Sequence, residues 1–329
     1  MQSRTVSFIK DFMLPIAIVS GISLYLIYHF SPFLHSSGPV LSKVTVEAQR
    51  FLVALMLFLQ FVKISPHDLR FTRWHLRALL FQSVTFVGFA LIAMTTQDEG
   101  IRILLECAML CLICPTASAA GVITERLGGN LAQTVSYVVI INTIATFLIP
   151  AIIPMVKPSA ELSFWAYVWR IGLKIFPVLI LPSVLAWTIR YTTHRLQRWL
   201  MRHAHWSFYI WGICLTLAMV LATRALVMSH LSIGIIACIV LISMGCCAVQ
   251  FAFGRKSSKD PVTKVTAGQS LGQKNTGFLI WLGYNYMTPV TSVAGGLYAI
   301  WQNIFNSWEL YEKNHHGKKA SENEEPGTK

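Results

Sequence analysis

The sequence predicts an all-α membrane protein of ten transmembrane helices, arranged as two inverted repeats of five helices each. Three observations predict this fold class. The chain is 54% hydrophobic and only 12% charged, whereas about a quarter of the residues in a soluble domain are charged. Ten apolar segments of membrane-spanning length follow one another along the chain. The fourth and ninth segments, half a chain apart, are interrupted by proline, glycine and polar residues.

The ten apolar segments fill most of the 329 residues. A helix needs roughly 20 residues to cross the hydrocarbon core, and each segment has about that length. The predicted spans are, in order, 11–30, 45–63, 77–95, 103–124, 131–153, 168–189, 207–227, 231–253, 262–281 and 284–305. Because each half has an odd number of spans, the two halves have opposite topology.

The predicted spans form one domain. We expect a single transmembrane domain over 1–311, with the first repeat at about 8–155 and the second at about 163–306. The residues that follow are polar and poor in hydrophobic side chains, which is typical of disorder. The sequence therefore predicts a disordered cytoplasmic tail over 312–329.

Basic residues crowd three of the short loops, those that follow the second, sixth and eighth spans. The loops after the third and fifth spans contain few lysines or arginines. By the positive-inside rule, the basic loops face the cytoplasm. We therefore expect a multi-pass protein of the cell (inner) membrane with both termini in the cytoplasm. These loops also account for the net charge of +13, so we expect no nucleic-acid partner. The sequence makes no prediction of oligomeric state.

The first interruption runs from Leu112 to Gly121. Pro115 removes a backbone donor and clashes with the preceding turn. Thr116 and Ser118 add hydroxyl groups beside the carbonyls that the break frees, and such oxygens suit a hard cation or a polar substrate. The alternative is a proline kink that neighbouring hydroxyls repair.

The second interruption runs from Ala267 to Gly277 and is more polar, with Ser270, Gln273, Lys274 and Asn275 inside an apolar span. An ionisable residue at membrane depth indicates a functional site. Lys274 has three possible roles: it pairs with an anionic substrate, it stands where another transporter binds a metal cation, or it carries a coupled proton. The alternative is that its side chain snorkels to the interface.

Two breaks at matching places in two halves are typical of the binding site of a secondary transporter. An intramembrane enzyme is disfavoured, because the chain has no His-Glu-x-x-His pattern and Glu106 is the one carboxylate near a break. A membrane sensor or scaffold that transports nothing remains an alternative. The seven cysteines all lie in apolar segments, where small hydrophobic packing explains them better than metal binding.

Three short motifs resemble those of the bile acid:sodium symporter family. They are Cys-Pro-Thr-Ala-Ser at 114–118, Gly-Gly-Asn at 128–130 and Gly-Gln-Lys-Asn at 272–275. The resemblance implies a panel domain and a core domain, with the fourth and ninth helices unwound and crossing in the core. It also implies transport of organic anions, such as bile acids or smaller carboxylates, by alternating access.

The chain departs from the sodium-coupled members of that family. Those members have a Ser-Asn pair where this chain has Ala120 and Gly121. They have a glutamate where this chain has Ser270, and a glutamine where it has Lys274. Loss of the carboxylate and several oxygens weakens a sodium site, and a lysine ammonium there repels sodium.

Some of the remaining positions that supply sodium ligands in the family keep a polar group in this chain, and others do not. Thr134 keeps a hydroxyl where the family supplies a sodium ligand, Val138 does not, and Gln82 aligns loosely with a family glutamine near the second sodium. The predicted substrate- or ion-binding residues are Gln82, Pro115, Thr116, Ser118, Gly121, Asn130, Thr134, Ser270, Gln273, Lys274 and Asn275.

The sequence therefore predicts an organic-anion transporter of this fold in which Lys274 replaces the bound cations. We expect no cofactor and transport that is independent of sodium. The alternatives are a sodium-coupled symporter of the same family and the non-transporting sensor or scaffold.

Overall fold

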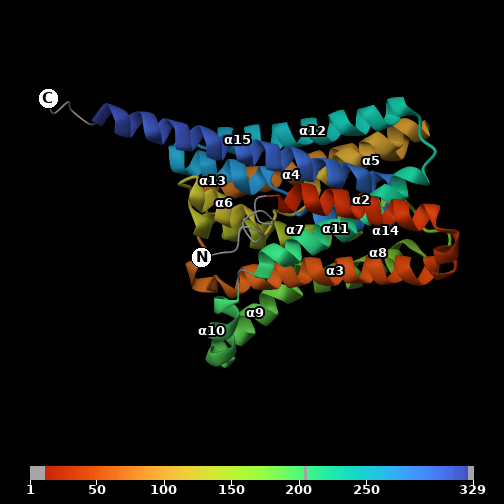
Figure 1. Cartoon of the computed structure of the whole chain (residues 1–329), viewed down its shortest axis with the longest axis horizontal. Coiled ribbons are helices and arrows are strands. Elements are labelled where there is room, and N and C mark those ends of the chain that lie inside the picture. The colour runs from red at the N-terminus through yellow and green to blue at the C-terminus, as the bar shows by residue number, and fades with distance from the viewer. Residues whose placement is uncertain (1–11, 204–205, 325–329) are drawn as a thin grey trace.

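Residues 12–203 and 206–324 are described by the computed structural model, which is an elongated bundle of helices (Figure 1). Most helices run along the long axis of the bundle, and the described residues include no β-strand. The helices of the first half are α2 (Met13–Phe30), α3 (Gly38–Val62), α4 (Arg73–Thr95), α5 (Glu99–Ile113), α6 (Ala120–Arg126) and α7 (Leu131–Val156). Two 3₁₀ turns, η1 (Pro32–Ser37) and η2 (Pro66–Asp68), lie on either side of α3.

The second half begins with α8, after the loop that follows α7. Its helices are α8 (Phe164–Leu179), α9 (Leu181–Thr192), α10 (His194–Arg202), α11 (Trp206–Val227), α12 (Ile233–Lys256), α13 (Pro261–Gly272), α14 (Thr276–Tyr286) and α15 (Ser292–Glu324), with a 3₁₀ turn η3 (Pro289–Thr291) before α15. Each predicted span overlaps one of these helices or a pair of them.

Seven helical segments of the described chain are long and apolar enough to cross a membrane. They are α2, η1 with α3, α4, α7, α8 with α9, α11 and α12. Four shorter helices, α5, α6, α13 and α14, make up the two interrupted segments, and α15 is long but carries a polar C-terminal part. The prediction of an all-α membrane protein is therefore confirmed.

The short helices on either side of each break begin and end where capping residues and proline favour it. Helix α5 ends at the residue before Cys114 and Pro115, because the position before a proline disfavours helical backbone. Helix α13 begins after Asp260, whose carboxylate accepts hydrogen bonds from the Thr263 hydroxyl (2.6 Å) and backbone N–H (2.8 Å). These two bonds hold the pKa of Asp260 below its usual value, and the bond from the Thr263 hydroxyl has the larger effect.

The two halves repeat the same packing neighbours. Helix α4 packs on α5 and α7, and in the second half α12 packs on α13 and α15. Helix α2 packs on α11, and α9 packs on α3. Helices α5 and α12 then join the two halves across the centre. The interrupted helices are therefore held in the interior by uninterrupted ones.

The three basic loops lie at one end of the bundle, the end where α10 projects (Figure 1). The Arg77 guanidinium donates to the carbonyl of Ser257 at 2.8 Å, which joins the start of α4 to the end of α12. The hydroxyl of Tyr191 lies 2.8 Å from Nδ1 of His67, which joins the end of α9 to η2. The basic residues of three loops that are separate in the sequence therefore lie together on one face, at this end of the bundle.

The tail differs from the prediction. The sequence predicts disorder over 312–329, whereas α15 continues as helix to Glu324, and 325–329 lie outside the described residues. The segment contains helix-forming Glu, Lys and Ala residues and no proline before Pro326. Extending an existing helix avoids the cost of nucleating a new one, which a reading of polarity alone does not take into account.

Candidate functional site

The two interrupted helices cross at their breaks. The segment between α5 and α6 runs antiparallel to the segment between α13 and α14, and Thr116 and Lys274 form an isolated β-bridge. The backbone N–H of Ala117 donates to the carbonyl of Gln273 at 3.0 Å. Each break therefore satisfies backbone groups of the other, which non-helical backbone at membrane depth requires.

Further bonds tie the two breaks together. The N–H of Asn275 donates to the carbonyl of Pro115 at 2.8 Å. The Thr116 hydroxyl donates to the carbonyl of Ser270 at 2.6 Å, and the Cys114 thiol donates to the carbonyl of Asn275 at 3.1 Å. Thr116 and Ser270 are fully buried. Pro115, Thr116 and Asn275, which the sequence predicts as site residues, thus meet at the crossing.

A glutamine and a tyrosine support the first break from α4 and α7. The side-chain amide of Gln82 donates to the carbonyl of Leu112 at 2.6 Å, and the Tyr137 hydroxyl donates to the side-chain oxygen of Gln82. Both side chains are fully buried. Leu112 lies in the last turn of α5, where carbonyls lack helical partners. Gln82 is therefore bonded to protein groups through both ends of its amide.

A second glutamine and tyrosine support the other break from α12 and α15. The amide of Gln250 donates to the carbonyl of Cys111 at 3.1 Å and to the Tyr298 hydroxyl at 3.0 Å. That hydroxyl donates to the carbonyl of Gly272, the last residue of α13, at 2.8 Å. Sequence reasoning missed this pair, although a lone amide in the apolar α12 is a signal that could have drawn attention to Gln250.

Lys274 is buried at the centre of the crossing, with its side chain only 1% exposed. Its backbone N–H donates to the Gln302 side chain at 2.8 Å, but Nζ has no hydrogen-bond partner among the described residues. It therefore does not snorkel. The carbonyl ends of α5 and α13 meet here and favour a positive charge.

The predicted oxygen ligands on α7 and α13 are bonded to one another. The Ser270 hydroxyl donates to the carbonyl of Thr266 at 2.6 Å and lies 3.2 Å from the Thr134 hydroxyl. The Thr134 hydroxyl donates to the carbonyl of Asn130 at 3.2 Å. The Asn130 side chain accepts from the N–H of Gln133 at 3.0 Å and so begins α7. These residues lie together beside the crossing.

Two of the predicted residues make no polar contact with the crossing among the described residues. Ser118 is half-buried and its hydroxyl has no hydrogen bond there. Gly121 is buried, and a Cβ at this position would lie 2.7 Å from Cδ1 of Leu131. Gly121 therefore allows α6 to pack on α7.

A family model decides the class of protein. The model of the SBF-like CPA transporter family matches residues 16–266, from α2 to the middle of α13. The chain belongs to this family. No curated protein matched the chain. The family assignment confirms the resemblance to the bile acid:sodium symporters, to which this family is related, and identifies a multi-pass membrane transporter.

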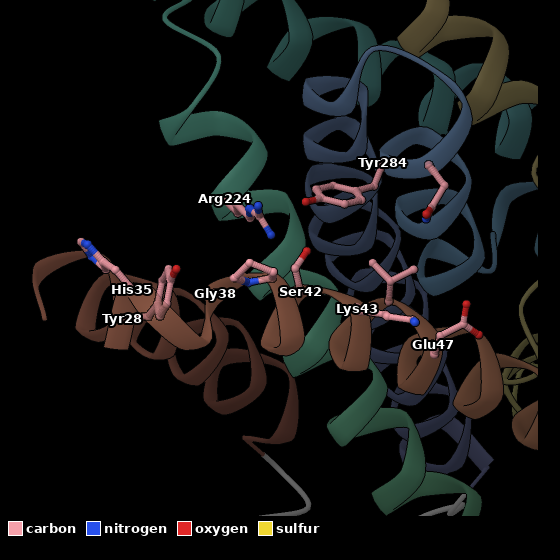
Figure 2. Close-up of a pocket in the computed structure, with 11 residues that line it drawn as sticks. Tyr28, His35, Gly38, Ser42, Lys43, Glu47, Arg224 and Tyr284 are labelled. Carbon is pink, nitrogen blue, oxygen red and sulfur yellow. The ribbon is translucent and has the colours of Figure 1, made fainter. Parts of the chain in front are cut away.

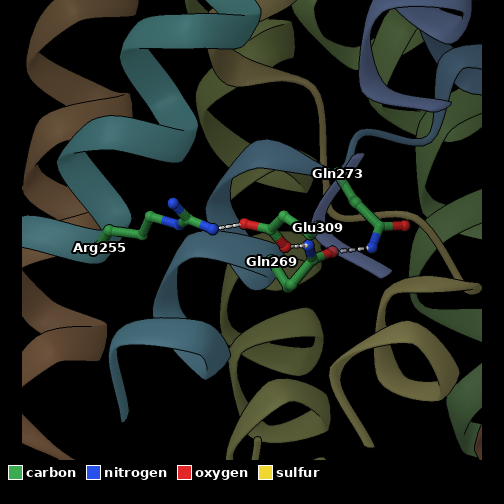
Figure 3. Close-up of polar contacts among 4 residues, drawn as sticks. All are labelled: Arg255, Gln269, Gln273 and Glu309. Carbon is green, nitrogen blue, oxygen red and sulfur yellow. Dashed lines mark hydrogen bonds and ion pairs between the residues drawn. The ribbon is translucent and has the colours of Figure 1, made fainter. Parts of the chain in front are cut away.

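In this SBF-like transporter, a polar network extends from Gln273 at the second break to Arg255 near the end of α12 (Figure 3). The Gln273 amide donates to the side-chain oxygen of Gln269, and the Gln269 amide donates to the Glu309 carboxylate. Arg255 of α12 forms an ion pair with Glu309, whose side chain is only 5% exposed. The guanidinium also lies over the Phe305 ring, 5.3 Å from its centroid. Sequence reasoning missed Glu309 because it lies beyond the predicted tenth span.

The transporter also has an open cavity of about 570 Å³ at the other end of the bundle. Figure 2 shows Arg224 of α11 and Tyr284 of α14 on one side of it and the start of α3 on the other. Arg224 is half-buried, and its guanidinium has no hydrogen bond or ion pair among the described residues. Glu47 pairs with Arg50 at 2.5 Å. The cavity is lined by Tyr28, His35, Gly38, Pro39, Ser42, Lys43, Val46, Glu47, Arg224, Tyr284 and Asn285.

Proposed function

We propose that this protein is a secondary transporter that moves an organic anion across the cell (inner) membrane by alternating access, without sodium coupling. The observation that carries the proposal is the buried amine of Lys274, which lies at the crossing without a hydrogen-bond partner among the described residues. A buried charge costs several kcal/mol unless its surroundings compensate it. A residue that serves packing alone does not need such a group.

Lys274 acts as a built-in cation. The carbonyl ends of α5 and α13 converge on the crossing and favour positive charge there. The oxygens of Gln82, Thr134 and Ser270 are bonded to other protein groups. A sodium ion would have to share these oxygens with the protein groups that they already contact, and would approach a like charge. A sodium-coupled symporter of the same family is the alternative.

The transport domain consists of two inverted repeats of five spans within 1–311. In this arrangement α4 corresponds to α12, the α5–α6 pair to the α13–α14 pair, and α7 to α15. The repeated packing neighbours support it, and so do the two glutamine–tyrosine pairs, which occupy corresponding helices. The core domain is then formed by α4–α7 and α12–α15, and the panel by α2, α3, α8, α9 and α11.

The basic end of the bundle faces the cytoplasm, so that both termini are cytoplasmic. The gathering of the three basic loops at one end supports this orientation. The cavity at the start of α3 then opens to the outside.

The substrate is an organic anion, a carboxylate that is bile-acid-like or smaller, and it approaches through the outer cavity. Lys43 and Arg224 provide positive charge there, and Tyr28 and Tyr284 provide hydroxyl groups. A volume of about 570 Å³ falls in the range of small-molecule sites. The cavity lies between panel helices α2, α3 and α11 and core helix α14, where alternating access moves one body against the other.

The test replaces Lys274 and measures uptake of organic anions into proteoliposomes. Lys274→Ala is expected to lower uptake at least about tenfold, which corresponds to about 1.4 kcal/mol. Lys274→Arg keeps the charge and is expected to retain more uptake. Lys259→Ala, in the loop before α13, is the matched control. Full uptake by Lys274→Ala, at a normal level in the membrane, would sink the proposal.

A sensor or scaffold is the second candidate, since tight bonding at the crossing suits a rigid protein as well. Thermal melting with and without each of the organic anions offered in the uptake test separates the two. A ligand that binds the folded state raises its melting temperature. A transporter is expected to show the shift, and a scaffold need not.

A further inference from the structure

Helix α10 lies outside the packed bundle. It is nine residues long and has no buried residue. Its main contacts are with α9 and α3. Figure 1 shows it projecting from the basic end, at an angle to the long helices. Leu200 is its one residue that packs against the main core. The helix therefore needs another surface to cover its side chains.

The two faces of α10 differ in chemistry. At helical spacing, Arg195, Arg198 and Arg202 share one face, and all three are exposed. Leu196 lies on the other face with Leu200, and Trp199, one turn after Arg195, lies at the border between the two faces. Leu196 and Trp199 are 40% and 47% exposed. A short helix with basic residues on one face, leucine on the other and tryptophan at the border is typical of helices that lie in the membrane interface.

The chain segment that contains α10 carries charge of one sign. The sequence contains no aspartate or glutamate between Glu161 and Asp260. Among the described residues, neither Arg195 nor Arg198 forms an ion pair, although Nε of Arg198 donates to the carbonyl of His194 at 3.4 Å. Arginine guanidinium groups bind phosphate groups through paired hydrogen bonds. The face therefore suits an anionic partner in the plane of the membrane.

We propose that α10 binds the headgroups of anionic phospholipids in the leaflet at the basic end of the bundle. Leu196 and Trp199 enter the interface, while Arg195 and Arg198 contact the phosphates. Because the start of α10 is joined to α9 and α9 packs on α3, a bound lipid anchors this pair of helices to one leaflet. The proposal does not depend on which anion is transported.

The full-length protein in nanodiscs tests the proposal. Nanodiscs of phosphatidylcholine alone are compared with nanodiscs that also contain phosphatidylglycerol, and hydrogen exchange of 194–203 is measured in both. Native mass spectrometry counts the phosphatidylglycerol molecules that the protein retains. The wild type is expected to retain phosphatidylglycerol in preference to phosphatidylcholine and to show slower exchange of α10 when it is present.

The variant Arg195→Gln/Arg198→Gln is expected to lose that preference, at least about fivefold, since it removes two positive charges that attract an anionic surface. Arg195→Lys/Arg198→Lys, which keeps the charge, retains it. The control Arg126→Gln/Lys256→Gln removes two exposed charges from the same end and leaves α10 protection unchanged. Equal protection of wild-type α10 in both lipids would overturn the proposal, and that result needs no variant.

Discussion

Tyr298 places a hydroxyl between the side-chain amide of Gln250 and the carbonyl of Gly272. It accepts from the Gln250 amide and donates to the carbonyl of Gly272. Tyr137 makes the corresponding contact with Gln82. All of these side chains are buried, so water cannot replace the lost bond.

Removing either hydroxyl should weaken the crossing. We expect Tyr298→Phe and Tyr137→Phe each to lower the free energy of unfolding by about 1–3 kcal/mol, because a buried polar group is left unsatisfied. Tyr209→Phe, at an exposed position of α11, should change it little. Thermal melting in detergent measures all three. Equal melting temperatures for the three variants would contradict the role given to the two pairs.

The residues at the crossing differ in how far the sequence predicts them. Lys274 could be predicted because an ionisable residue in an apolar segment has few explanations. The Gln250–Tyr298 contact could not, since its partners are 48 residues apart along the chain. Gly121 is predicted among the substrate- or ion-binding residues because it lies in the first break, and the structure adds that it packs closely on Leu131.

The close approach of α12 and α13 depends on a glycine. A Cβ on Gly254 would lie 2.4 Å from the carbonyl oxygen of Ala267, which is backbone and cannot rotate away. On the same helix, a Cβ on Gly245 would meet nothing within 4 Å. The two positions form a matched pair.

We expect Gly254→Ala to force the two helices apart and to lower the free energy of unfolding by about 1–3 kcal/mol. Gly245→Ala should be neutral or stabilising by up to about 1 kcal/mol, since alanine is the better helix former. Melting temperatures and uptake give the comparison. A Gly254→Ala protein as stable as Gly245→Ala would mean that α12 and α13 do not approach as closely as described.

The ion pair between Arg255 and Glu309 joins α12 to α15 and, through Gln269, to α13. Arg255→Gln leaves the buried carboxylate of Glu309 without its counter-charge and should destabilise the protein by up to about 3 kcal/mol. The double variant Arg255→Gln/Glu309→Gln removes both charges and should be more stable than Arg255→Gln alone. A double-mutant cycle on thermal melting measures the difference, and strictly additive effects would contradict the pairing.

At this scale the sequence predicts the existence of helices better than their ends. Each membrane segment can be recognised as a run of apolar residues, because the thickness of the bilayer sets the length of that run. The end of α15 was predicted too early because the polar residues after Glu312 still favour helix. The division of the sixth predicted span into α8 and α9 depends on Ile180 at the junction and on Pro182 just after it.

Across the whole molecule, two features lie at opposite ends: the basic face with α10, and the cavity lined by Lys43 and Arg224. The sequence predicted the first through its loops. It could not predict the cavity, because the lining residues come from four helical segments that are far apart in the sequence: α2, η1 with α3, α11 and α14. In the sequence, their charged residues look like ordinary residues at the ends of loops. Between the two ends lies the crossing, with Lys274 at its centre.

The most direct test of the central claim, that Lys274 takes the place of a coupling cation, is uptake into proteoliposomes. A panel of organic anions is offered with an inward sodium gradient and with the same gradient of choline. The account predicts equal initial rates in the two conditions for any anion that is transported. Uptake that requires the sodium gradient would contradict it, and would mean that the hydroxyl and carbonyl oxygens at the crossing bind sodium despite the lysine.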